Sequence, residues 1–92
     1  MDCEWDPAKA SQNLRKHKVS FKEASTVFGD ALSVTFADPD HSVVERRFVT
    51  IGTTVKGRVI MVAHTHRGER VRIISARPLT QGERSAYEDD AD

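Results

Sequence analysis

The chain has 92 residues and a mass of 10.3 kDa, which suffices for one domain with a single core and excludes a two-domain protein. Val and Ile together number fourteen against three Leu, and because β-branched side chains pack well on a pleated surface, this composition favours a sheet over an all-helical bundle. The formal net charge of zero hides an uneven distribution of acids and bases along the chain.

Two helices are predicted in the N-terminal third. Residues 1–5 are expected to form an edge strand or an ordered arm. Asp6-Pro7 has the pattern of an N-cap followed by the first helical residue, so a helix is expected from Pro7 to about His17. Ser20-Phe21-Lys22-Glu23 has the pattern of a capping box, which predicts that a second helix starts at Ser20 and stops at Gly29-Asp30.

The rest of the chain has strand character up to a terminal helix. Four β-type runs are separated by turn residues: 32–36, 44–51, 58–65 and 71–76. Their short connections indicate antiparallel hairpins. A second capping box, Thr80-Gln81-Gly82-Glu83, opens a helix through about Glu88, and residues 88–92 are expected to be a frayed acidic tail.

These elements predict a single α+β domain over residues 1–92, in the order β-α-α-β-β-β-β-α. Two N-terminal helices are expected to pack on one face of a small antiparallel sheet, with the C-terminal helix closing it. Helix in 44–51 or 71–76 would contradict this fold.

Basic residues are concentrated in the middle of the chain. Residues 42–77 carry two acids and eight bases, seven of which are Arg, whereas residues 1–41 and 78–92 are net acidic. The planar guanidinium group suits phosphate and carboxylate. An Arg-dominated centre between acidic flanks therefore indicates an anionic partner.

This residue set can support phosphodiester cleavage of RNA without a metal ion. A base would remove the ribose 2′-proton, cations would stabilise charge on the phosphate, and an acid would protonate the leaving oxygen. Glu45 is the candidate base, and the phosphate-binding candidates are Arg47, Arg67, Arg72 and Arg77. A role for Glu45 as a mere cross-strand partner of these arginines stays open. On a regular strand Arg72 and Arg77 would face opposite sides, so one of them is expected to drop out.

The histidines and the cysteine suggest no metal centre. His64 and His66 share a strand face by their spacing, but the sequence supplies no cluster with a third ligand beside them. His17 could donate to phosphate, act as the acid, or cap the C-terminus of its helix. A single Cys3 excludes an intramolecular disulfide. Glycine patterns of nucleotide or dinucleotide sites are absent, so no cofactor is expected.

No apolar run reaches the roughly 18 residues of a membrane helix, and the N-terminal residues lack a signal pattern. The expected location is the cytoplasm.

Six groups of residues resemble the BrnT toxins in identity and order. They are Trp5-Asp6-Pro7-x-Lys9, Asn13-x-x-Lys16-His17-x-Val19-x-Phe21-x-x-Ala24-x-x-Val27-Phe28, Glu45-x-Arg47-Phe48-x-x-Ile51-Gly52, Thr65-x-Arg67, Arg72-Ile73-Ile74-Ser75-Ala76-Arg77 and Glu83-Arg84-x-x-Tyr87. The resemblance runs from Trp5 to about Glu88. Lys-His-x-Val-x-Phe followed by Arg-Ile-Ile-Ser-Ala-Arg is specific as a set.

The resemblance implies a RelE-like fold and a ribonuclease that inhibits translation. It also implies a BrnA-type antitoxin with a ribbon-helix-helix portion, through which the complex binds operator DNA, and a heterotetramer of two toxins and two antitoxins is expected. The polar motif positions become the catalytic candidates: Lys16, His17, Glu45, Arg47, Arg67 and Arg77. Three further arginines are candidates for RNA or phosphate binding: Arg46, Arg70 and Arg72.

The sequence departs from the family pattern at two turns. Lys18 replaces the usual Gly after Lys-His, where it could alter the turn between the helices, and Ala31 replaces Pro after Asp30. Neither change removes a chemical group. The alternative to an RNA-cleaving toxin is a module that binds its antitoxin without useful catalysis. Nucleic-acid binding without cleavage ranks third.

Overall fold

The structure is a computed structural model that describes residues 2–38 and 46–90. The elements are β1 (Cys3–Glu4), α1 (Pro7–His17), α2 (Phe21–Ser25), the 3₁₀ helix η1 (Thr26–Gly29), β2 (Val34–Ala37), β3 (Arg47–Thr53), β4 (Val59–Arg67), β5 (Arg70–Pro78) and α3 (Gln81–Asp90). This arrangement confirms the predicted α+β fold and element order.

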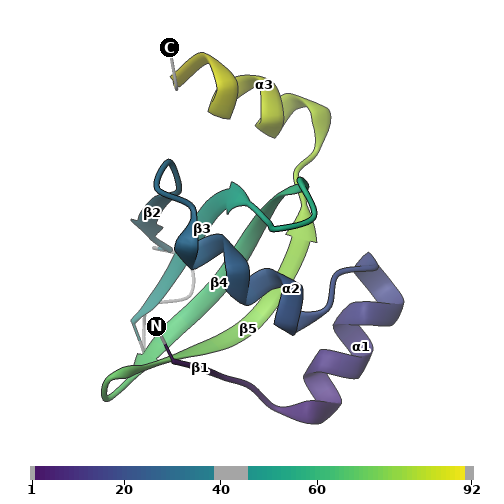
Figure 1. The fold of residues 1–92 in the computed structure, drawn as a ribbon, viewed down its shortest axis with the longest axis vertical. Coiled ribbons are helices and arrows are strands. Elements are labelled where there is room, and N and C mark those ends of the chain that lie inside the picture. Colours follow the sequence, from purple (N-terminus) through teal and green to yellow (C-terminus); the bar gives the residue numbers. More distant parts are fainter. Residues whose placement is uncertain (1, 39–45, 91–92) are drawn as a thin grey trace.

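The strands form one five-stranded sheet in the order β1-β5-β4-β3-β2. The four longer strands are antiparallel neighbours, as predicted. β1 is an edge strand and pairs in parallel with β5, opposite Val71 and Arg72, so the sheet is mixed rather than purely antiparallel. In Figure 1, α2 crosses one face of this sheet, α1 lies beside β5, and α3 lies beyond the end of β5.

Several strand boundaries differ from those predicted. β4 runs to Arg67 and β5 starts at Arg70, because a two-residue turn joins them. Gly68 has a φ of 61° at the first central position, which is where a type II′ hairpin turn needs glycine. His66 therefore lies in the strand rather than in the turn. β3 begins at Arg47, and residues 44 and 45 lie outside the described residues.

Helix α1 has the predicted boundaries. Its N-cap Asp6 accepts a hydrogen bond from the backbone N–H of Ala8 at 2.9 Å. Its C-cap Lys18 adopts the left-handed conformation, with a φ of 60°, and donates its backbone N–H to the carbonyl of Leu14. Glycine adopts this conformation at less cost than lysine. The turn nevertheless keeps the left-handed conformation with Lys18 at this position.

The first capping box is only half formed. Ser20 caps α2 by accepting from the N–H of Glu23, as predicted. The carboxylate of Glu23 instead forms an ion pair with Arg58 and accepts from the hydroxyl of Thr54. These contacts outcompete the backbone of Ser20 because a buried carboxylate needs a cation, and the Arg58 hydrogen bond is the main cause of the lowered pKa of Glu23.

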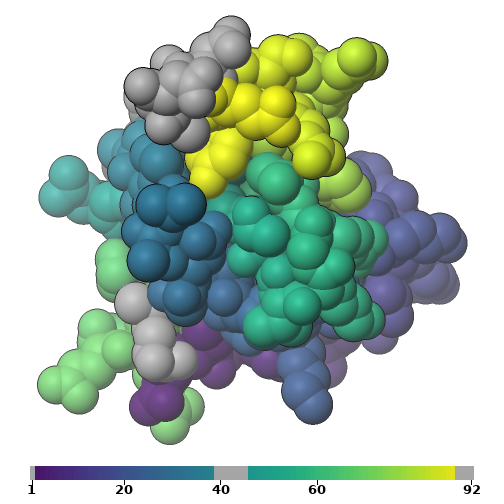
Figure 2. All heavy atoms as spheres, turned by 45° about the horizontal axis from the view of Figure 1, so that its top comes forward, coloured from purple at the N-terminus to yellow at the C-terminus, as the bar shows by residue number. Residues whose placement is uncertain are grey.

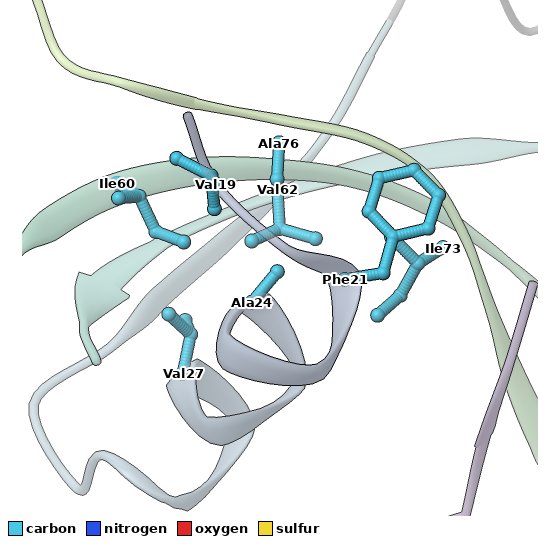
Figure 3. Close-up of a cluster of buried hydrophobic side chains, with 8 residues drawn as sticks. All are labelled: Val19, Phe21, Ala24, Val27, Ile60, Val62, Ile73 and Ala76. Atoms are coloured by element: carbon cyan, nitrogen blue, oxygen red, sulfur yellow. The ribbon is translucent and has the colours of Figure 1, made fainter. Parts of the chain in front are cut away.

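The core lies between α2 with η1 and the inner face of the sheet, defined here as the face that these helices cover. Figure 3 shows the buried side chains of this core: Val19, Phe21, Ala24, Val27, Ile60, Val62, Ile73 and Ala76. Gly52 allows the close approach of η1 to β3, since a Cβ there would lie 2.9 Å from Cγ1 of Val27.

Asn13 fastens α1 to the edge of β5. Its side-chain amide donates to the carbonyls of Val19 and Ala76 at 2.9 and 2.8 Å, and its Oδ1 accepts from the N–H of Ala76 at 3.0 Å. The side chain thus takes the place of a neighbouring strand at Ala76. Because these atoms are buried, the three hydrogen bonds replace water that cannot reach them.

Candidate active site

A β-bulge places Arg72 and Arg77 on the same face of the sheet. Ala63 pairs with Ser75 but His64 pairs with Ile73, so Ile74 is an extra residue in β5. Consistent with this, Ile73 and Ala76 both lie in the core although they are three residues apart. The argument that the two arginines face opposite sides is therefore wrong: the bulge turns Arg77 to the outer face, the face opposite α2.

Four arginines gather where β4 and β5 are joined. Thr65 lies between Arg47 on β3 and Arg72 on β5, and Arg67 lies opposite Arg70. We call Arg47, Arg67, Arg70 and Arg72 the hairpin-end arginines. Arg72 also forms an ion pair with Glu4 of β1 at 2.8 Å, so part of this positive charge is neutralised. The group still combines four cationic side chains within a few residues of one turn.

Arg77 lies apart from the hairpin-end arginines, at the other end of β5. Five residues of strand separate it from Arg72, which is about 16 Å. Its guanidinium binds both carboxylate oxygens of Glu83 at 2.8 and 2.9 Å. This ion pair and the N–H of Thr80 lower the pKa of Glu83 to about 2. The four arginines expected to form one anion site are thus divided between the two ends of β5.

Lys16 and His17 lie between these two groups, at the edge of β5. They come from the last turn of α1 and line a hollow of about 260 Å³ together with Ile74 and Ser75. Asn13 holds this turn in place through its contacts with Ala76. Lys16 is exposed and His17 is half-buried, so both are accessible from solvent.

The other candidates are placed as follows. Glu45, the candidate base, lies outside the described residues. Arg46 is exposed just before β3, where its guanidinium lies 6.0 Å from the ring centre of Phe48 and its carbonyl accepts from Thr65.

The two histidines of β4, His64 and His66, have their ring centres 6.2 Å apart. Within the described part of the chain, no three His, Cys, Asp or Glu side chains are grouped as metal ligands would be. His64 is buried between Phe28 and Phe48, and its Nε2 shares a 2.7 Å hydrogen bond with the hydroxyl of Thr50. Its Nδ1 meets no hydrogen-bond partner among the described residues.

Burial of His64 predicts a loss of stability in mild acid. Burial, with a smaller contribution from His66, lowers the pKa of His64 from 6.5 to about 4. The unfolded chain therefore binds the proton first, and stability that is complete above pH 6.5 should fall as the pH drops from 6.5 to 4. Thermal unfolding between pH 4 and 7 should show this slope, and the variant His64→Phe should have a shallower one. Equal slopes would contradict a neutral, buried His64.

The arrangement is suited to binding an extended polyanion. Basic side chains occur in sequence along β5: the hairpin-end arginines, then Lys16 and His17, then Arg77. Phosphate attracts such side chains strongly and imidazole can transfer a proton near neutral pH. The structure therefore places basic side chains and an imidazole near one strand edge.

Sequence reasoning did not assign three residues that shape this site. Glu4 and Glu83 neutralise Arg72 and Arg77, and Asn13 positions Lys16 and His17. Asn13 and Glu83 both stand at quoted motif positions, and Glu83 also belongs to a predicted capping box, but neither position indicates the partner that the residue contacts. The pairing of Glu4 with Arg72 depends on the parallel register of β1, which the sequence does not specify.

Comparison with known proteins identifies one family. Residues 5–83 match the sequence model of the family described as "Ribonuclease toxin, BrnT, of type II toxin-antitoxin system". The fold is similar to the 1.1 Å crystal structure of the Brucella abortus ribonuclease toxin, BrnT, with a TM-score of 0.65 and 24% identity, covering 88% of this chain and 99% of that chain. No curated protein sequence matches the chain. None of the described helices is long and apolar enough to cross a membrane.

Proposed function

This chain belongs to the BrnT family of ribonuclease toxins of type II toxin-antitoxin systems, and from that premise we propose that it is an endoribonuclease that cleaves RNA without a metal ion and so inhibits translation. The observation that carries the proposal is the line of cationic side chains along β5, with an imidazole at its middle. Cations placed there would stabilise a phosphate in the role that a metal ion fills in other nucleases.

The reaction we propose is attack by the ribose 2′-oxygen on the neighbouring phosphate. A base, for which Glu45 is the candidate, takes the 2′-proton as the bond from O2′ to phosphorus forms. The bond from phosphorus to O5′ breaks, and His17 protonates the leaving oxygen. The products are a 2′,3′-cyclic phosphate and a 5′-hydroxyl. Lys16, Arg47, Arg67 and Arg77 would hold this phosphate and its neighbours.

We further propose that a BrnA-like antitoxin with a ribbon-helix-helix portion neutralises the chain. The family implies an antitoxin partner. Covering the Arg-rich end of the sheet with carboxylates would displace RNA by competition. The complex would contain two toxins and two antitoxins and would bind operator DNA through the antitoxin, in the cytoplasm.

A second function is favoured by the two ion pairs of the site. Arg72 is bound to Glu4 and Arg77 to Glu83. If these carboxylates stay in place, two candidate phosphate ligands are already occupied. The chain would then be a module that binds its antitoxin and helps to regulate the operon, with weak or no catalysis.

Growth of cells that express the chain separates the two functions. A ribonuclease should arrest growth, and co-expression of the neighbouring gene product should restore it. The double replacement Arg67→Ala and Arg77→Ala should relieve the arrest, while Lys22→Ala, an exposed position on α2, should not. Normal growth with abundant, folded wild-type chain and no partner would favour the inert module.

A further inference from the structure

The outer face of the sheet carries an apolar groove that the proposed reaction does not use. It encloses about 600 Å³ between β2, β3, β4 and α3 and is lined by Asp30, Leu32, Val34, Phe36, Ile51, Thr53, Met61, Glu83, Ala86 and Tyr87. The hydroxyl of Tyr87 donates to the carbonyl of Leu32, which ties α3 to the segment before β2. Figure 2 shows α3, in yellow, meeting this blue segment.

Large apolar side chains of the groove are exposed to solvent. Leu32 is 79% exposed, Val34 50% and Phe36 46%, and all three line the groove. Val34 and Phe36 alternate on β2 with Thr35 and Ala37, so both project from the outer face. A groove lined by neighbouring exposed apolar side chains is a candidate site for an apolar segment of another molecule.

The charges at the groove favour a protein over RNA. Among the described residues that line it, the charged ones are Asp30 and Glu83, both acids. The carboxylate of Asp30 accepts from the N–H groups of Leu32 and Thr53, and that of Glu83 binds Arg77. Among the described residues the nearest cation is Arg77, which contacts Met61 and is already paired with Glu83, so the phosphates of RNA would find little attraction in the groove. An apolar peptide segment would bury its side chains against aliphatic and aromatic carbon.

The hairpin-end arginines lie close enough to the groove to contact the same bound segment. Ile51 of the groove and Arg47 lie on the same face of β3, four residues and about 13 Å apart. Arg72 lies in the same row as Arg47, with Thr65 between them. A segment that leaves the groove along β3 would therefore reach positive charge after about four extended residues, where a carboxylate would be attracted.

We propose that the groove is the docking site for the antitoxin, which inserts apolar side chains beside Val34, Phe36 and Met61 and places a carboxylate near Arg47 and Arg72. The inference rests on the partner that the proposed function requires. The docking site is a different surface from the proposed catalytic site, because Lys16 and His17 do not line the groove. Neutralisation follows from blocking access to the hairpin-end arginines.

Charge substitutions in the groove test this docking site. The variants are Val34→Asp and, separately, Leu32→Asp. Leu32 is 79% exposed, so a charge there should leave the fold intact. The matched control is Val55→Asp, since Val55 is apolar and also 79% exposed but does not line the groove. Each chain is co-expressed with the tagged product of the neighbouring gene, and the affinity, the thermal unfolding temperature and RNA cleavage by the free chain are measured.

We expect both groove variants to bind the partner at least tenfold more weakly than Val55→Asp, with unchanged unfolding temperature and RNA cleavage. Equal affinity of groove and control variants would overturn the proposal, as would a wild-type chain that does not bind this partner. Loss of RNA cleavage with normal partner binding would instead assign the groove to RNA. Loss of a homodimer with normal partner binding would assign it to a second copy. If the wild-type chain cleaves no RNA while the groove variants still lose the partner, the docking site stands and the ribonuclease proposal fails.

Discussion

Replacing Asn13 by Leu should destabilise the fold by about 3 to 5 kcal/mol and abolish activity in the same step. The change leaves the carbonyls of Val19 and Ala76 and the N–H of Ala76 buried without partners, and each such group costs about 1 to 3 kcal/mol. Domains of this size have a total stability of roughly 5 to 14 kcal/mol. The variant should therefore unfold at a much lower urea concentration than the wild-type chain.

The control for this prediction is Ser11→Ala on the same helix. Ser11 is exposed, and a surface substitution of this kind should change stability by less than about 0.5 kcal/mol. Equal urea midpoints for Asn13→Leu and Ser11→Ala would contradict the role of Asn13 as the attachment of α1 to β5. Amide exchange at Ala76 supplies a local readout, since its N–H should lose protection in the Leu variant.

Replacing His17 by Ala should lower RNA cleavage by about 100-fold or more, because a general acid contributes about that much to such a reaction. His17 lies at the surface end of α1, so the variant should keep the unfolding temperature of the wild-type chain within a few degrees. The measurement is the initial rate of cleavage of a labelled RNA at pH 7.

Lys22→Ala serves as the control for this rate, since Lys22 is exposed on α2 and lies on the other face of the sheet from the hairpin-end arginines. Its rate should equal that of the wild-type chain. A His17→Ala rate within threefold of wild type would show that the acid lies elsewhere.

The fold was predictable because its local signals agree with each other. Asp6-Pro7 begins α1, Ser20 caps α2, and Thr80 with Glu83 forms a complete capping box at α3, in which each bonds the backbone N–H of the other. These contacts join residues two or three positions apart, so sequence spacing specifies them. The hairpin turns are similarly local. The turn predicted at residues 66–69 is two residues longer than the one that joins β4 and β5.

The face of the sheet to which Arg77 belongs was not predictable. It depends on the bulge at Ile74, which is a feature of the pairing between β5 and β4. The partners of Glu23 were missed for the same reason, because Thr54 and Arg58 lie more than thirty residues away in the chain. Long-range pairings decide both cases, and a single sequence carries little information about them.

The sequence names the candidate residues of the site but does not specify how they are arranged. Cationic motif positions identified Lys16, His17 and the arginines as a set. Their division along β5 follows from strand register and from ion pairs with Glu4 and Glu83, which composition cannot specify.

The most direct test of the ribonuclease proposal is to incubate the purified chain with RNA in excess EDTA and to map the new ends. We expect cleavage at a rate unaffected by EDTA, with 5′-hydroxyl and 2′,3′-cyclic phosphate ends, because the chain's own cations and imidazole would carry the reaction. Cleavage that requires a divalent metal ion, ends with a 3′-hydroxyl, or no cleavage at all by the folded wild-type chain would contradict it.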